Sequence, residues 1–214
     1  MPTAREALLN AAAAALAALP WSAIRMVDVA CAAGVSRQTL YNEFGSKEGL
    51  ARALVRREAD AYLYGVEGAL RARSDAIERL VSVAEWTVVE ASARPLLRAL
   101  LTGCWGDRLP APRPAPVRHR APAGPPAQRR ADGGAPDPGE LVAAVRERSR
   151  AALGQGHRGG EEADGDGTGD DAVEAACEMA VRLALSYVVA PGPGDVGSLL
   201  RRVLSATSPT TGGR

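Results

Sequence analysis

Hydrophobic residues recur at helical spacing along most of the chain, and helix-breaking residues divide this pattern into segments. The apolar stripes predict helices over 3–19, 25–34, 36–44 and 46–71, the last with Gly65 and Gly68 expected to allow a bend. After a predicted cap at Ser74, further helices are expected over 77–91, 96–102, 140–153, 172–190 and 196–204. The pattern therefore predicts an all-α protein.

Two segments interrupt the helical pattern. Residues 107–139 are rich in Pro, Arg, Ala and Gly, and residues 154–171 are rich in glycine and acidic side chains. Neither contains enough large apolar residues to offset the entropy lost on ordering, so both are predicted to be flexible insertions, as is the tail over 207–214. The basic first segment could contact DNA or a partner, but an expanded linker is the favoured interpretation.

The composition fits a helical bundle, because aromatic residues make up only 4% of the chain and short aliphatic residues dominate. A net charge of +1 does not by itself indicate nucleic-acid binding, which depends on the charge of one face. No apolar run is long enough to span a bilayer and no secretory signal is recognised, so a cytoplasmic protein without membrane contact is expected.

Candidate chemistry is sparse. The three cysteines lie far apart, and this spacing predicts neither a zinc site nor a disulfide. Both histidines, His119 and His157, fall in the predicted flexible segments, and no nucleophile motif accompanies them. The acidic run over 164–171 lacks the glutamate that a calcium loop places at its twelfth position. We therefore expect no enzyme activity, no metal and no cofactor.

The stretch from Met26 to Lys47, MVDVACAAGVSRQTLYNEFGSK, contains two short helices joined by a glycine turn. In the second helix Leu40 and Phe44 are expected to point to the core, and Ser36 is placed to cap its first turn. This arrangement is typical of a helix-turn-helix, which places one helix in the major groove of DNA.

The outward side chains of the second helix suit that role. Arg37 and Gln38 can bond base edges, and Thr39 offers a methyl group to thymine. Tyr41, Asn42 and Lys47 suit phosphates, the lysine at the start of the next helix. A solvated polar face on a helical protein-interaction module, without DNA binding, is the alternative that spacing alone leaves open.

Residues 5–54 closely resemble the N-terminal domain of the TetR (tetracycline-repressor) family of bacterial transcriptional regulators. The matching motifs are V-D-V-A at 27–30, A-G-V-S at 33–36, T-L-Y at 39–41 and F-G-S-K-E at 44–48. The resemblance implies a three-helix DNA-binding domain over 1–48, followed by a helical-bundle ligand-binding and dimerisation domain over 49–206. It implies DNA contacts at Arg25, Ser36, Arg37, Gln38, Thr39, Tyr41, Asn42 and Lys47. Arg25 departs from the threonine most common there, and Asn42–Glu43 replaces a His-Tyr or Tyr-His pair.

The C-terminal segment over 172–190 is apolar on two sides, so it needs two neighbours to pack against. Together with the helix over 196–204 it suits a four-helix dimer interface, two helices from each subunit, as the resemblance also implies. The expected interface residues are Val181, Leu185, Val188, Val189, Leu199, Leu200 and Val203.

The expected function is that of a homodimeric regulator, most often a repressor, which binds a near-palindromic operator in double-stranded DNA and responds to a small-molecule effector. The large or polarisable residues of the second domain are the candidates for the effector pocket: Tyr62, Trp86, Glu90, Cys104, Trp105 and Tyr187. The apolar composition around them favours an apolar or amphipathic effector.

Overall fold

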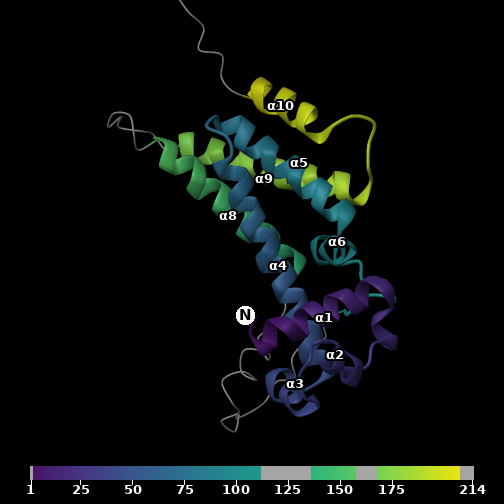
Figure 1. Cartoon of the computed structure of the whole chain (residues 1–214). Coiled ribbons are helices and arrows are strands. Elements are labelled where there is room, and N and C mark those ends of the chain that lie inside the picture. The colour runs from purple at the N-terminus through teal and green to yellow at the C-terminus, as the bar shows by residue number, and fades with distance from the viewer. Residues whose placement is uncertain (1, 112–135, 158–167, 208–214) are drawn as a thin grey trace, which may run out of the picture. The chain divides into compact units, whose positions relative to one another are not determined.

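The computed structural model describes residues 2–111, 136–157 and 168–207 (Figure 1). These residues form helices and no strand, which confirms the all-α prediction. The α-helices are α1 (Ala4–Ala18), α2 (Met26–Ala32), α3 (Arg37–Phe44), α4 (Lys47–Arg71), α5 (Ala76–Ala93), α6 (Pro95–Thr102), α8 (Pro138–His157), α9 (Thr168–Val189) and α10 (Val196–Thr207), and a 3-10 turn, η1, covers Trp21–Ala23. Within the described ranges, no helix combines the length and the apolar character that a membrane span needs.

The chain divides into two compact units. The first contains Met1–Asp60 and Gly103–Asp137, and the second contains Ala61–Thr102 and Pro138–Arg214. Helix α4 crosses the boundary between them, so its first half belongs to one unit and its second half to the other.

In the first unit, α1 packs against α2 and α3. The helix begins with the capping box that Thr3 and Glu6 form: the Thr3 hydroxyl accepts from the Glu6 amide, and the Glu6 carboxylate accepts from the Thr3 amide. Leu8, Leu40 and Phe44 are almost fully buried, at 0–2% exposure. The prediction that Leu40 and Phe44 point to the core is therefore confirmed.

In the second unit, α5 packs against α9 and α10, and α8 packs against α9 (Figure 1). Their shared core contains Leu80, Ala84, Cys177, Ala180 and Leu200. The Cys177 thiol is fully buried, and this burial raises its pKa to about 11. Cys177 is thus an apolar core residue, whereas Cys31 and Cys104 are exposed.

The structure corrects the predicted boundaries. The cap of α5 is Asp75, whose carboxylate accepts from the Glu78 amide at 2.9 Å, and not Ser74. Order extends into both predicted flexible insertions, because residues 107–111 are described and helices cover 138–157 and 168–189. The remainder of those predictions, 112–135 and 158–167, and the tail from 208 lie outside the described residues.

Helix α4 is continuous through Gly65 and Gly68, and Gly65 has a packing role. A Cβ atom at Gly65 would lie 2.1 Å from Cζ2 of Trp86, so only glycine lets the indole approach the helix backbone. Trp86 in turn stacks on Tyr62, with ring centroids 5.5 Å apart. At Gly68 the same added atom would meet nothing within 4 Å.

Three of the residues assigned to a dimer interface lie in the interior of a single chain. Val181, Val188 and Leu200 are 6%, 4% and 0% exposed. They are covered by neighbouring helices of their own unit, so the assignment of these three is corrected. The sequence could not separate the two apolar faces of this segment, because a helix in a bundle core and a helix at an interface show the same pattern. Val189 is 61% exposed, and Leu185, Leu199 and Val203 are partly exposed.

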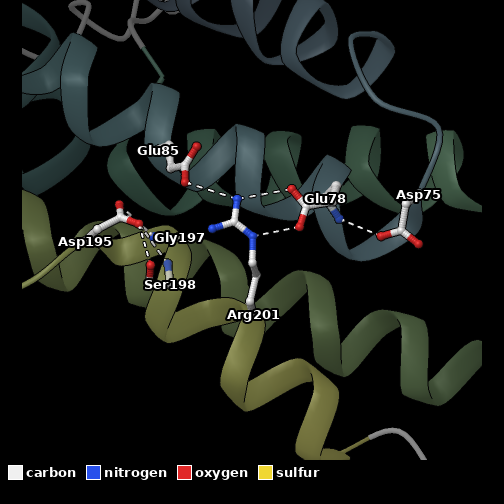
Figure 2. Close-up of polar contacts among 7 residues, drawn as sticks. All are labelled: Asp75, Glu78, Glu85, Asp195, Gly197, Ser198 and Arg201. Atoms are coloured by element: carbon white, nitrogen blue, oxygen red, sulfur yellow. Dashed lines mark hydrogen bonds and ion pairs between the residues drawn. The ribbon is translucent and has the colours of Figure 1, made fainter.

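A cluster of charged residues holds α10 against α5 (Figure 2). The Arg201 guanidinium donates to both carboxylate oxygens of Glu78, at 2.7 and 3.1 Å, and lies 3.5 Å from Glu85. Asp195 caps the start of α10 by accepting from the Gly197 and Ser198 amides. The hydrogen bond from Arg201 lowers the pKa of Glu78 and raises that of the arginine.

We expect Arg201→Met to lower the melting temperature modestly, by a few degrees at most, because the cluster is partly exposed. The pKa of Glu78 is lowered in the folded chain, so this contribution is present above the usual glutamate pKa and disappears as the pH falls through the lowered value. The difference between wild type and Arg201→Met in thermal melts should therefore vanish in acid. Arg202→Met, at the exposed neighbouring position, is the matched control.

Candidate nucleic-acid interface

The turn between α2 and α3 is fixed by backbone geometry and one cap. Gly34 has a φ of 67°, a left-handed conformation that favours glycine, and the Val35 amide bonds the Ala30 carbonyl at 3.1 Å. The Ser36 hydroxyl then accepts from the Thr39 amide at 3.0 Å and bonds the Thr39 hydroxyl. The predicted cap at Ser36 is confirmed, and with it the start of α3.

Helix α3 presents a polar face opposite its buried one. Leu40 and Phe44 lie inward, whereas Arg37, Gln38 and Asn42 are exposed. Positions four residues apart pair along the outer face: Gln38 Nε2 donates to Asn42 Oδ1 at 2.9 Å, and the Arg37 guanidinium lies 5.3 Å from the centre of the Tyr41 ring. The outward side chains are therefore held in defined positions on a helix whose core side is fixed.

The inner side of α3 is also supported by a cation. The Arg5 guanidinium of α1 lies 4.7 Å from the centre of the Phe44 ring, and Arg5 Nη1 is 3.6 Å from the Glu43 carboxylate. Gly45 ends the helix with a φ of 70°, and the Ser46 hydroxyl accepts from the Gly49 amide at 3.1 Å to begin α4. Ser46 thus caps the first turn of α4.

Arg25 has a local partner that the sequence interpretation did not assign. Its guanidinium donates twice to the Asp28 carboxylate, at 2.8 and 3.0 Å, and this pairing raises the pKa of the arginine. Arg25 stands at the position before α2 and makes no side-chain cap to the helix amides. A carboxylate three residues after an arginine at a helix start is the only sequence signal for this pair.

We expect Asp28→Asn to tighten DNA binding by up to about fivefold, because it frees the Arg25 guanidinium for a phosphate and removes a negative charge. The slope of log affinity against log salt should steepen by up to about one unit. The gain should shrink in an Arg25→Ala background. Asp60→Asn, which removes the same charge from an exposed position of the first unit, is the control in a binding titration.

Lys47 lies at the first position of α4 and is engaged within the first unit. Its ammonium is 3.3 Å from the Ser22 carbonyl oxygen and 5.3 Å from the centre of the Trp21 ring. Trp21 was not among the predicted site residues, because an aromatic residue between two helices carries no periodic signal. The eight predicted DNA contacts thus lie in the segment from Arg25 to Lys47 of one compact unit.

The six predicted pocket residues are not brought together. Tyr62 and Trp86 stack on each other, and Glu90 forms an i,i+4 ion pair with Arg94 at 3.0 Å, so it is no buried anchor. Tyr187 packs at the edge of the core cluster of the second unit. Cys104 and Trp105 belong to the first unit, and the cysteine is exposed. Sequence could not show this, because the chain crosses between units at Gly103.

The second unit contains a small enclosed cavity of about 10 Å³. Only Tyr62 of the predicted set lines it. The other lining residues are Val83, Thr87, Leu101, Val142, Val145, Ala180, Val181, Ala184 and Leu185. Its polar groups are two buried hydroxyls, Tyr62 Oη and Thr87 Oγ1, which bond each other at 3.0 Å. Burial raises the pKa of Tyr62 to about 12, so its hydroxyl stays protonated at neutral pH.

A larger hollow of about 260 Å³ lies where α5 begins, beside α9 and the end of α10. It is lined entirely by aliphatic side chains and a methionine: Ala76, Ile77, Leu80, Leu153, Ala172, Val173, Ala175, Ala176, Met179 and Leu204. None of the described residues that line it carries a side-chain hydrogen-bonding group that could orient a ligand.

Comparison with known proteins agrees with the geometry of the first unit. The family model described as bacterial regulatory proteins, tetR family, matches residues 8–54. The HTH-type transcriptional regulator AlkX of Mycobacterium tuberculosis (strain ATCC 25618 / H37Rv) is 42% identical over 100 residues, which are 46% of this chain and 47% of that protein. The chain therefore matches less than half the length of this relative.

Two solved structures share the fold over almost the whole chain. The TetR family repressor AlkX from Dietzia sp. strain DQ12-45-1b, implicated in biodegradation of n-alkanes, has a TM-score of 0.53 at 20% identity, and 94% of each chain is covered. Thermus thermophilus FadR, a TetR-family repressor in complex with lauroyl-CoA, has a TM-score of 0.50 at 17% identity, with coverage of 98% of this chain and 100% of that one. Residues 8–54 therefore carry the N-terminal motif of the tetR family of bacterial regulatory proteins, and the chain as a whole shares the fold of these two solved structures.

Proposed function

We propose that this chain is a homodimeric repressor that binds a near-palindromic operator and is released from it by a small-molecule effector. The observation that carries the proposal is the outer face of α3. Gln38 and Asn42 lie opposite the buried Leu40 and Phe44, and Arg37 and Tyr41 lie beside them. A helix held in this way can enter the major groove with Arg37 and Gln38 toward base edges and Tyr41 and Asn42 toward phosphates.

One such helix reads only half of a site. A monomer with three cations between Arg25 and Lys47, one of them paired with Asp28, offers little charge for tight binding. A dimer would present two α3 helices, which would double the number of DNA contacts and match two successive major grooves. The four predicted interface residues that remain at least partly exposed, Leu185, Val189, Leu199 and Val203, support a dimer through α9 and α10. A sedimentation mass of one chain at micromolar concentration would exclude it.

The effector is proposed to bind at the Tyr62–Thr87 pair. These hydroxyls are enclosed by aliphatic side chains, which fits a molecule with an apolar body and one polar group. Lauroyl-CoA, which the Thermus thermophilus FadR structure contains, has an acyl chain of this kind. The cavity of about 10 Å³ has room for no more than about one water molecule.

A ligand can therefore occupy this place only if the surrounding helices separate. It binds the separated state and not the closed one, which is the condition for shifting an equilibrium between them. Tyr62 lies on α4, the helix that continues into the first unit. Displacement of the second half of α4 by the ligand is the proposed route to the DNA-binding segment, because the same helix begins at Lys47.

An electrophoretic shift with the DNA upstream of the chain's own gene tests the DNA-binding part. We expect the double variant Tyr41→Ala/Lys47→Ala to bind this DNA at least about a hundredfold more weakly, because it removes two phosphate contacts from each of the two subunits. Tyr64→Ala/Arg98→Ala, at exposed positions of the second unit, is the matched control and should bind as wild type. Equal binding by all three proteins would favour the interaction-module alternative.

Lauric acid and dodecane separate the two parts of the effector proposal. Lauric acid should release the DNA at a lower concentration than dodecane, because only the acid can bond the Tyr62 and Thr87 hydroxyls. Tyr62→Phe/Thr87→Val removes both hydroxyls together, so neither is left unpaired in the core. This variant should lose the preference for the acid while still binding DNA; an unchanged preference would place the effector elsewhere.

A further inference from the structure

Trp21 connects three parts of the first unit. Its ring lies 5.3 Å from the Lys47 ammonium, and its backbone amide donates to the Arg108 carbonyl at 2.8 Å. Pro20 precedes it in extended conformation, and η1 begins at Trp21 itself. The tryptophan is partly buried and is therefore held at its backbone by one segment while its ring faces the lysine of another.

Lys47 is the only lysine of the chain, and its long side chain loses rotamer entropy when it is restricted. Two contacts restrict it here: the indole face and the Ser22 carbonyl oxygen at 3.3 Å. An ammonium has three donors, and neither contact requires more than one of them. The amine is thus fixed beside the first turn of α4, where the positive end of the helix dipole also favours a phosphate.

We propose that Trp21 is a positioning residue for DNA binding: its ring fixes the Lys47 ammonium for a phosphate, and the Arg108 carbonyl fixes the tryptophan. This inference rests on the proposed DNA-binding function. It deepens that function, because it gives the segment 103–111 a part in positioning a DNA-contacting side chain of the first unit. That segment follows directly on α6, so the chain that leaves the second unit bonds the residue which orients Lys47.

A double-variant cycle with operator DNA tests the proposal. Trp21→Leu should weaken binding by about five- to tenfold, because it keeps an apolar side chain and the backbone amide but loses the ring face. Trp21→Phe should stay within about twofold of wild type, because a ring face remains. Ser22→Ala keeps the carbonyl that Lys47 contacts and is the control.

The deciding arm is the Lys47→Met background. Trp21→Leu should cost nothing further there, because the side chain that Trp21 positions is gone. If Trp21→Leu weakens binding as much in that background as in wild type, its role is structural and the proposal is wrong. Equal loss for Trp21→Phe and Trp21→Leu would overturn it as well.

A measurement without DNA keeps this proposal distinct from the proposed function. Trp86→Phe/Trp105→Phe leaves Trp21 as the sole tryptophan of the three. Removing the ammonium by Lys47→Met should then shift the emission of Trp21. An unchanged emission would show that the contact is absent and overturn the inference. If the emission shift is present but the wild-type chain binds no DNA, the contact between Trp21 and Lys47 exists and the proposed DNA-binding function is contradicted instead.

Discussion

Phe44→Ala should cost about 3–5 kcal/mol of stability and abolish DNA binding. Phe44 is 2% exposed, and the removed ring fills the space under α3 and lies beneath the Arg5 guanidinium. The backbone cannot close the gap, because the Phe44 carbonyl already approaches Gly49 so closely that a Cβ there would lie 1.9 Å from it. A domain with a total stability of about 5–15 kcal/mol would then be partly unfolded.

Thermal and urea unfolding followed by circular dichroism measure this loss. Phe44→Leu, which keeps most of the volume and loses the contact with Arg5, should cost about 1–2 kcal/mol. Asn42→Ala is the matched control two positions earlier: its side chain is exposed, so stability should change by no more than about 0.5 kcal/mol while DNA binding weakens. Similar unfolding curves for Phe44→Ala and Asn42→Ala would contradict the burial of the ring.

Gly65→Ala and Gly68→Ala should change the stability of the second unit in opposite directions. Alanine is favoured over glycine in a helix by up to about 1 kcal/mol, and both positions lie within α4. At Gly68 nothing lies within 4 Å, so the full gain is expected. At Gly65 the added methyl would lie 2.1 Å from the Trp86 ring, and overpacking of this kind costs about 1–3 kcal/mol.

The two variants should therefore differ by about 1–3 kcal/mol in free energy of unfolding, because the gain in helix propensity is common to both and cancels. Trp86 cannot yield cheaply, because its ring is stacked on Tyr62, which is 2% exposed. Gly65→Ala should become harmless when combined with Trp86→Ala, which removes the clashing ring. If Gly65→Ala melts at the temperature of Gly68→Ala, the close approach of the indole is not a feature of the folded chain.

Local sequence signals were sufficient for the DNA-binding segment. The periodic Leu40 and Phe44, the turn at Gly34 and the hydroxyl of Ser36 act within a few residues of each other, so their roles can be read from spacing. The residues that contact the predicted DNA-binding side chains were harder to predict. Asp28 lies close in sequence to Arg25. Trp21 contacts Lys47 across 26 positions, and no periodic pattern predicts that contact.

The pocket and the interface were predicted less well, for a physical reason. Large aromatic residues were grouped because size alone marks them, whereas the structure places Tyr62 and Trp86 in one unit and Trp105 in the other. The hydroxyl partner of Tyr62 is Thr87, an inconspicuous residue 25 positions away. Val181 and Leu200 carry the same apolar signal in a core as at a subunit contact, so only packing distinguishes the two.

The sequence by itself determined what depends on neighbours along one helix: where helices begin and end, which stripe is apolar, and the motifs shared with the family. Tertiary structure decided what depends on residues that meet after folding. It chose which apolar face of α9 is buried, turned Gly65 into the site where Trp86 packs, and joined α10 to α5 through Arg201. Helical periodicity specifies a face and not the neighbour that covers it, because that neighbour comes from a distant part of the chain.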